Sequence, residues 1–151
     1  MNKKIYFASP FFNKEQVERE ERLKKKLRDL GYNVFSPKEN TFLKKDASFE
    51  EQNRVYKENI KNIEDCDILF GVTDGKDMGT IWECGYANGL NTNNKKKIII
   101  IYYCETLKDG KFNLMLARSA DLVITNYKDM DNFVELLKEG NKYEGYIEWI
   151  F

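Results

Sequence analysis

Histidine is absent from this sequence of 151 residues. Catalysis that uses an imidazole as general base or as proton shuttle is therefore excluded. Any catalytic site must be built from carboxylates, tyrosine, lysine or cysteine. Of these side chains, the carboxylates are the best placed along the sequence.

Cysteine is scarce as well. The three cysteines, Cys66, Cys84 and Cys104, are odd in number and form no Cys-x-x-Cys pair. This pattern argues against a disulfide framework and against a zinc site, and it is typical of proteins in the reducing cytosol.

Long apolar runs and an excess of charge of one sign are also lacking. The longest apolar run, Ile98 to Cys104, is far too short to span a bilayer, and the first residues show no apolar signal-peptide region. Lys plus Arg and Asp plus Glu balance at 25 each, so no basic field favours a nucleic-acid polymer or an anionic membrane. We expect a soluble cytoplasmic protein with neither of these partners.

Strand-like and helix-like segments alternate along the chain. The strand-like segments are residues 5–8, 33–36, 67–72, 97–103 and 122–125. The run at 97–103 is continuously apolar, as expected of a strand buried on both faces of a parallel sheet. The alternation predicts a single domain, residues 1–151, with a doubly wound α/β fold: a flavodoxin- or Rossmann-like five-stranded parallel sheet with helices on both faces.

Two finer expectations concern the helices. In the helix that follows the second strand, Tyr56, Ile60 and Ile63 stand at positions i, i+4 and i+7, which predicts one buried apolar face. In the next helix, which begins near Thr80, Gly89 is predicted to end the helix.

The strand order also predicts where a ligand binds. In a doubly wound sheet, the site lies beyond the carboxyl ends of the strands, near the point where the strand order reverses. We therefore expect residues 9–12, 73–79 and 105–113 to converge there. The polar loop at 38–47 is long enough to act as a flap.

The segment from Asp77 to Ala87 is the most informative part of the chain. It places Glu83 in the opening turns of a helix, among apolar side chains that we expect to be buried or to line a pocket: Ile81, Trp82, Tyr86 and Ala87. A carboxylate in apolar surroundings suggests a chemical role.

Two interpretations of the acids are open. In the first, Asp77 only caps the helix and Glu83 is a surface carboxylate. In the second, the helix dipole, worth roughly 0.3–1 kcal/mol, holds Glu83 ionised as the nucleophile of a glycosyl transfer. Asp77 would then hold sugar hydroxyls or assist proton movement. Gly79 next to Thr80 removes bulk beside the loop, and Gly85 is expected to let a neighbouring element approach closely, so both favour the second interpretation.

Metal and phosphate sites are less favoured. Asp65, Asp67, Asp74 and Asp77 could form a magnesium cluster, since hard cations take oxygen ligands. Asp67 opens the third strand, however, whereas Asp74 and Asp77 follow it, so the two sets are expected at opposite ends. The segment from Gly71 to Asp77 has no phosphate-loop pattern. We predict no metal and no cofactor.

Three aromatic residues have two interpretations each. Tyr6 on the first strand either packs in the core or bonds Glu83 through its hydroxyl, across adjacent strand ends. Phe11 and Phe12 follow that strand, and they either pack in the core or stack on a planar ligand.

Over nearly its whole length the chain resembles the nucleoside 2-deoxyribosyltransferase family. Ile5-Tyr6-Phe7-Ala8 and the aromatic pair behind it resemble the family's first strand and base-stacking loop. Asp77-x-Gly79 with Glu83-x-Gly85-Tyr86-Ala87 is similar to the family's nucleophile helix, and this is the most specific part. Asn113-Leu114-Met115 is similar to the segment that family members lend to a neighbouring subunit's active site.

The resemblance implies a role for each matching residue. Glu83 would attack the anomeric carbon of a 2'-deoxynucleoside and expel the base, and a second free purine or pyrimidine base would capture the sugar. Tyr6 would orient Glu83, and Asp77 would bind a sugar hydroxyl. The implied substrate-binding residues are Phe11, which would stack on the base, and Phe12, Asn59, Gly79, Asn113 and Met115.

The resemblance also implies a homo-oligomer, built from dimers and extending up to a hexamer. In it, Asn113 would complete the site of a neighbouring protomer. The chain continues past Tyr143-Glu144-Gly145 into an aromatic tail at 146–151. We expect this tail to pack against a neighbouring subunit or to close the pocket.

One position departs from the family pattern. Asn59 stands where the family commonly has an aspartate that handles the leaving base. An amide can hydrogen-bond to a base edge, but it cannot donate a catalytic proton as a carboxylic acid can.

Two other functions compete with the transferase. Hydrolases of the same fold cleave deoxynucleosides or deoxynucleoside 5'-monophosphates, and the latter bind phosphate with a Ser- and Gly-rich first loop that contains Arg. The first loop here, residues 9–13, is aromatic and lacks Arg and Gly. A non-enzymatic binding module would need an acidic pair or a phosphate-cradling loop where this chain has Ser9-Pro10. The sequence favours transfer of 2-deoxyribose between nucleobases, in nucleoside salvage.

Overall fold

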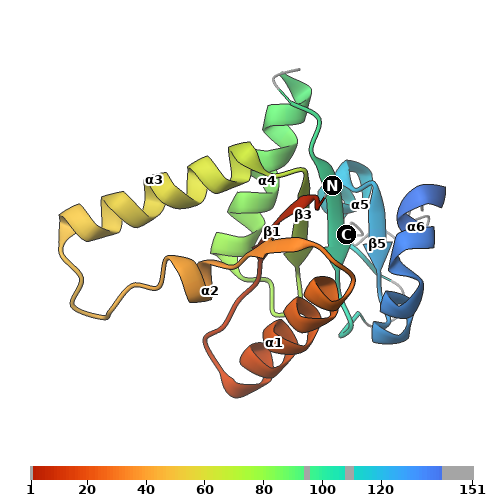
Figure 1. The fold of residues 1–151 in the computed structure, drawn as a ribbon, viewed down its shortest axis with the longest axis horizontal. Helices are drawn as coiled ribbons and strands as arrows, with labels where there is room; N and C mark the ends of the chain where they lie inside the picture. The colour runs from red at the N-terminus through yellow and green to blue at the C-terminus, as the bar shows by residue number, and fades with distance from the viewer. Residues whose placement is uncertain (1, 94–95, 108–110, 141–151) are drawn as a thin grey trace, which may run out of the picture.

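A parallel sheet forms the centre of the molecule in a computed structural model of the chain (Figure 1). The structure describes residues 2–93, 96–107 and 111–140. The strands lie in the order β2-β1-β3-β4-β5, and their bounds are Lys4–Ala8 (β1), Asn33–Phe35 (β2), Ile68–Val72 (β3), Ile99–Tyr103 (β4) and Leu122–Ile124 (β5). All neighbouring strands are parallel. The predicted doubly wound fold is confirmed, and the strand order reverses between β1 and β3.

Helices cover both faces of the sheet. Their bounds are Lys14–Asp29 (α1), Pro37–Asn40 (α2), Phe49–Asp65 (α3), Met78–Thr92 (α4), Leu114–Ser119 (α5), Tyr127–Asn132 (η1, a 3-10 helix) and Phe133–Glu139 (α6). No helix in the described residues combines the length and the apolar character needed to cross a membrane.

The first face packs against α1, η1 and α6. Leu23 and Leu27 of α1 are fully buried there, together with Met130 of η1 and Phe133 of α6. At the start of α1, the Asn13 side chain caps the helix by accepting a hydrogen bond from the backbone of the first turn.

The second face packs against α3, α4 and α5. Gly71 of β3 makes the close approach of α4 possible, because a Cβ at this position would lie 2.6 Å from Cys84 Sγ. The same role was expected of Gly85, but Gly85 has open space where its Cβ would be, so that expectation is wrong. The reason is that Gly85 lies on the exposed side of α4, whereas Cys84 faces the sheet.

Two helix expectations also need correction. The α4 helix continues through Gly89 to Thr92, because Gly89 keeps helical hydrogen bonds and the helix ends only at Asn93. In α3 the buried apolar residues are Val55 and Ile63, whereas Tyr56 is 56% exposed. Figure 1 shows the reason, because α3 extends well beyond the sheet and much of its length has no strand to pack against.

Candidate active site

A cavity of about 310 Å³ opens at the carboxyl ends of β1 and β3. This is the position predicted for a ligand in a doubly wound sheet, and the volume suits a small molecule. Four segments line the cavity: the loop after β1, the segment after β2 from Pro37 to Leu43, α3 through Val55 and Asn59, and the start of α4 through Asp77, Gly79 and Glu83.

Glu83 lies on the second turn of α4 and is half-buried in the cavity wall. The Tyr6 hydroxyl donates a hydrogen bond of 2.8 Å to Glu83 Oε1. This contact joins β1 to α4, and it is the one expected from the sequence as the functional alternative for Tyr6. Tyr6 itself is fully buried. Burial, together with the neighbouring Glu83, raises the pKa of the Tyr6 hydroxyl far above its usual range, so that this hydroxyl stays a donor.

The electrostatics of Glu83 differ from the expectation. Burial raises the pKa of the carboxyl to about 7, the Tyr6 hydrogen bond opposes this rise, and the charge of Asp77 adds to it. The helix dipole had been expected to hold Glu83 firmly ionised. Desolvation outweighs the dipole here, because the side chain is partly withdrawn from water whereas a dipole contributes only roughly 0.3–1 kcal/mol. Such a carboxylate is more basic than an exposed one.

Asp77 caps α4 and also lines the cavity. It is the N-cap of α4, and its Oδ2 accepts hydrogen bonds from the Thr80 backbone at 2.8 Å and from the Thr80 hydroxyl at 2.9 Å. The capping interpretation is therefore right. The same side chain also lines the cavity, beside Gly79 and near Glu83, where a ligand can reach it.

The aromatic pair after β1 lies at the cavity. The rings of Phe11 and Phe12 stack on each other, with centroids 5.2 Å apart, and both line the cavity. Phe12 is 74% exposed, so it does not pack in the core. The Phe12 backbone donates a 2.8 Å hydrogen bond to the Gln16 side chain, which ties the loop to α1.

The predicted flap contributes side chains that were not named from the sequence. Thr41, Phe42 and Leu43 line the cavity opposite α4. The signal available in the sequence was the apolar pair Phe42-Leu43 inside an otherwise polar loop. Thr41 donates a 2.7 Å hydrogen bond to Asn59 Oδ1, and so links the flap to α3.

Asn113 and Met115 lie away from the cavity that Glu83 lines. They line a second cavity of about 460 Å³, between the loop after β3 and α5, and they do not line the cavity of Glu83. The Asn113 side chain caps α5 by accepting from Met115 N and Leu116 N. Their expected role in a neighbouring protomer's site stays a prediction. The aromatic tail at 146–151 lies outside the described residues.

The apolar neighbours of Glu83 are not all buried. Ala87 faces the sheet, but Trp82 is 50% exposed and stacks on Tyr86 with ring centroids 5.5 Å apart. The expectation that Trp82 is buried or lines the pocket is therefore wrong. The cause is helical geometry, because Trp82 points from α4 toward α3. The ring centroids of Trp82 and of Tyr56 on α3 are 6.1 Å apart.

The acids considered for a metal site are separated. Asp67 accepts a hydrogen bond from the Lys4 backbone at the start of β1, whereas Asp74 accepts one from Thr106 N beyond the end of β3. In the described part of the chain, no group of three or more acidic, cysteine or histidine side chains is placed to bind a metal ion.

Comparison with known proteins agrees with this geometry. The sequence profile of the family described as nucleoside 2-deoxyribosyltransferase matches residues 5–115. No curated protein sequence matches the chain. Among solved structures, a 2-deoxyribosyltransferase from the psychrotolerant bacterium Bacillus psychrosaccharolyticus superposes with a TM-score of 0.75 and 35% identity, covering 88% of this chain and 95% of that one.

A conserved protein from Enterococcus faecalis V583 shares the fold, with a TM-score of 0.72 and 17% identity over 92% of this chain and 99% of that one. The family profile spans the cavity segments, from Tyr6 through Asp77 and Glu83 to Met115. The chain thus belongs to the nucleoside 2-deoxyribosyltransferase family.

Proposed function

We propose that this protein transfers 2-deoxyribose between nucleobases through a covalent deoxyribosyl-Glu83 intermediate. In the first step the Glu83 carboxylate attacks C1' of a 2'-deoxynucleoside, and the bond between C1' and the base nitrogen breaks. In the second step a ring nitrogen of a free purine or pyrimidine base attacks C1' from the vacated side, loses its proton to water, and releases the Glu83 carboxylate. Two successive inversions retain the configuration at C1'.

The observation that carries this proposal is the pairing of Glu83 with Tyr6 in the wall of a small-molecule cavity. The hydrogen bond leaves Glu83 with one carboxylate oxygen held at 2.8 Å by Tyr6 and the other available for attack. A carboxylate with a pKa near 7 is a stronger nucleophile than one in free solution, since nucleophilicity increases with basicity.

The remaining cavity residues suit a nucleoside. Asp77 lies beside Glu83 and would bind a sugar hydroxyl, while Phe11 offers an aromatic face for stacking on the base. The loop after β1 contains neither Arg nor Gly, so an unphosphorylated nucleoside fits better than a nucleotide. The three cysteines are free and buried, which is compatible with a salvage enzyme acting in the cytoplasm.

The proposal is tested by base exchange. The protein is mixed with a 2'-deoxynucleoside and a different free base, and the products are separated by chromatography. We expect the exchanged nucleoside from the wild type and none from Glu83→Ala. A matched control is Glu135→Ala, which removes an exposed glutamate of α6 on the opposite side of the sheet.

Two results would contradict the proposal. Release of free base and deoxyribose without exchange, even at high acceptor concentration, would make the protein a hydrolase. Exchange that survives Glu83→Ala would remove Glu83 from the mechanism. Quenching the reaction with donor alone is expected to give a protein mass increased by one deoxyribosyl group, and this increase should be absent in Glu83→Ala.

We further propose a homo-oligomer built from dimers, up to a hexamer, in which Asn113 completes a neighbouring site. Asn113 and Met115 lie away from the Glu83 cavity of their own chain, and Met115 is 74% exposed. Exposed aromatic rings of α3 and α4, Tyr56 and Trp82, offer an apolar face to a second copy.

Complementation tests this arrangement. Asn113→Ser retains a residue that caps α5 but shortens its reach, and it is mixed with Glu83→Ala under conditions that exchange subunits. Each variant alone is expected to be inactive. The mixture should recover about one quarter of the sites, those with Glu83 from one chain and Asn113 from the other. A mixture that stays inactive although the subunits exchange would show that the site lies within one chain.

A further inference from the structure

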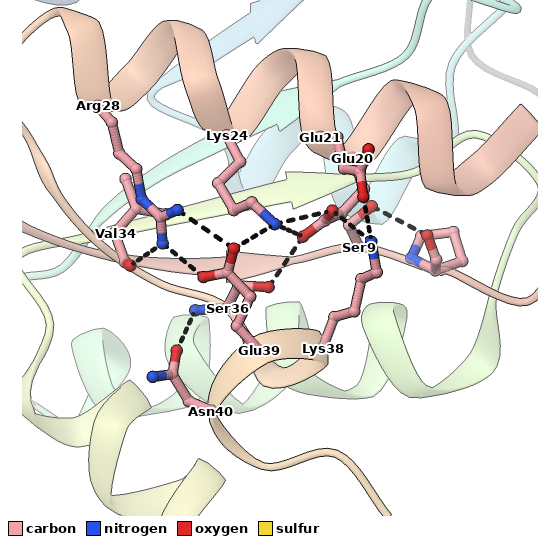
Figure 2. Close-up of polar contacts among 11 residues, drawn as sticks. Ser9, Glu20, Glu21, Lys24, Arg28, Val34, Ser36, Lys38, Glu39 and Asn40 are labelled. Carbon is pink, nitrogen blue, oxygen red and sulfur yellow. Dashed lines mark hydrogen bonds and ion pairs between the residues drawn. The ribbon is translucent and has the colours of Figure 1, made fainter.

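The short helix α2 is fixed to α1 by a buried ionic network (Figure 2). Glu20 is 1% exposed and Lys24 is 6% exposed, and the Lys24 ammonium lies 3.0 Å from Glu20 Oε1. The same ammonium lies 2.7 Å from Glu39 Oε1 on α2. An ion pair at this depth is held in one geometry, because either charge left alone would be costly.

Further hydrogen bonds hold the start of α2 in the same place. The Ser36 hydroxyl, which is buried, donates to Glu20 Oε1 at 2.9 Å, and the Ser36 backbone donates to Asn40 Oδ1 at 3.1 Å. Arg28 adds bonds to Glu39 and to the Val34 carbonyl, as Figure 2 shows. The residue that ends α2 is therefore fixed relative to the sheet.

Thr41 is the residue that ends α2, and it is 5% exposed. Its backbone donates to the Pro37 carbonyl at 3.0 Å. Its hydroxyl lies 3.3 Å from the same carbonyl oxygen and 2.7 Å from Asn59 Oδ1, and it donates its one proton at the shorter distance, to Asn59. The carbonyl oxygen of the Asn59 amide is thereby occupied by Thr41. Within the described residues, the Asn59 amide nitrogen makes no hydrogen bond, although the side chain lines the cavity.

The surroundings of Asn59 are those expected for a base. Phe11, Phe42, Leu43 and Val55 form the apolar part of the cavity, away from the acids at the start of α4. The carboxyl groups among the described lining residues are Asp77 and Glu83 alone, and both lie on α4 or at its cap. In the described cavity wall, the Asn59 side chain bonds to Thr41 and makes no hydrogen bond to either of these acids.

We propose that Thr41 is a positioning residue that holds the Asn59 carbonyl oxygen and so turns the amide N–H groups toward the base, and that the preferred substrates therefore carry oxo-bases that leave as anions. This inference rests on the proposed function. When Glu83 attacks C1', the bond between C1' and the base nitrogen breaks, and its electron pair stays on the base. The Asn59 N–H groups stabilise the negative charge at a base oxygen or ring nitrogen, and the base takes a proton from water after release.

Bases differ strongly as anionic leaving groups. Uracil delocalises the charge over two carbonyl oxygens, and a 5-fluoro substituent improves it further, whereas cytosine is a weaker acid and normally leaves after protonation. Uracil also presents an acceptor where cytosine presents an amino donor. An amide that presents its N–H groups to the base therefore favours uracil for two reasons: uracil is the better anionic leaving group, and it offers an acceptor to the amide.

The first test is a leaving-group series. Exchange rates, as kcat/KM, are measured for 5-fluoro-2'-deoxyuridine, 2'-deoxyuridine, thymidine and 2'-deoxycytidine, which share the sugar and nearly the same shape. We expect the wild-type rates to fall steeply in the order of decreasing acidity of the base, with 2'-deoxycytidine the slowest. In Asn59→Asp a carboxylic acid can donate a proton, an effect worth about 10²–10⁴-fold, so the 2'-deoxycytidine rate should rise and the series should flatten at low pH.

The second test concerns Thr41. Thr41→Val keeps the shape but removes the hydroxyl, and it should lower kcat/KM for 2'-deoxyuridine by up to about tenfold, the equivalent of one hydrogen bond. It should also narrow the preference for 2'-deoxyuridine over 2'-deoxycytidine, because the amide is then free to rotate. Thr41→Ser keeps a hydroxyl, so it should retain both the wild-type kcat/KM for 2'-deoxyuridine and the wild-type preference for it over 2'-deoxycytidine. Thermal unfolding of all three proteins controls for a loss of stability.

The outcomes separate this inference from the proposed function. No exchange and no cleavage with any donor would defeat the proposed function. Calorimetric binding of free uracil and free cytosine, to the wild type and to Thr41→Val, would then still decide the preference. A wild type that prefers cytosine, a flat leaving-group series, or a Thr41→Val variant with unchanged preference would overturn the inference while leaving exchange intact.

Discussion

The hydroxyl of Tyr6, at the centre of the sheet, donates a 2.8 Å hydrogen bond to Glu83 on the helix that packs over it. The two residues are 77 positions apart in the sequence. The bond stabilises the ionised carboxylate, against the burial that raises the pKa of Glu83 to about 7. The chemistry of the site therefore depends on the balance between desolvation and one hydrogen bond.

Removal of the Tyr6 hydroxyl should shift this balance. In Tyr6→Phe the pKa of Glu83 should rise by about one to two units, because a hydrogen bond to a charged group is worth about 1.5–3 kcal/mol. The acidic limb of kcat/KM should move to higher pH by the same amount. Tyr103→Phe is a matched control, because Tyr103 is also buried and donates to a carboxylate, Glu105, on the other face. An unchanged pH profile in Tyr6→Phe would contradict the role of the bond.

The raised pKa of Glu83 also predicts how activity and stability depend on pH. Activity should rise with pH through about 7, where Glu83 ionises. Stability should change in the opposite sense. The folded protein holds a proton on Glu83 that the unfolded chain releases near its ordinary pKa of 4.5, so this contribution is lost as pH rises from 4.5 to 7.

Glu83→Gln isolates this effect, because it retains the shape without the ionisation. Its melting temperature should match that of the wild type near pH 4 and exceed it at pH 8. Calorimetric scans at the two pH values measure the difference. Equal differences at both pH values would show that Glu83 has an ordinary pKa.

The packing of α4 on β3 predicts opposite effects for two glycines. Gly71→Ala places a Cβ 2.6 Å from Cys84 Sγ and 3.2 Å from the Tyr102 ring, and overpacking of this kind costs about 1–3 kcal/mol. Gly85→Ala meets nothing within 4 Å and should stabilise the helix by roughly 0.5–1 kcal/mol. Urea denaturation gives the free energy of unfolding of both variants. The prediction is wrong if Gly71→Ala is as stable as Gly85→Ala.

The ionic network under α2 predicts that neighbouring lysines differ in importance. Lys24→Met leaves the buried Glu20 with Lys38, 3.5 Å away, as its remaining ion-pair partner, and should cost up to about 3–5 kcal/mol. Lys25→Met removes only an exposed pair with Asp29, worth about 0.3–0.5 kcal/mol. The measurement is again the free energy of unfolding in urea. Equal losses in the two variants would argue against a buried network.

Local signals in the sequence were sufficient for much of the fold. The five strands lie where they were predicted, and the Asn13 cap of α1 and the capping box formed by Ser48 and Glu51 are local features of the same kind. These features depend on residues that are close in sequence: a cap bonds to its own first turn, and an apolar run is buried whatever strand lies beside it. The edge of the sheet at which the site lies was predicted from the order of strands and helices along the chain.

Features that depend on distant neighbours could not be predicted in this way. Tyr56 and Trp82 have apolar side chains, yet both are half-exposed because α3 and the outer side of α4 lie away from the sheet. The close approach of α4 depends on Gly71 rather than Gly85, which is decided by what packs against each glycine.

The sequence by itself determined that Glu83 lies in the opening turns of a helix at the carboxyl edge of a parallel sheet, because helix signals and the order of elements along the chain are local. Only the tertiary structure decided that Glu83 has a pKa near 7, and that Thr41 occupies the carbonyl of Asn59. The physical reason is that desolvation and hydrogen bonding depend on side chains that folding brings together from distant parts of the chain.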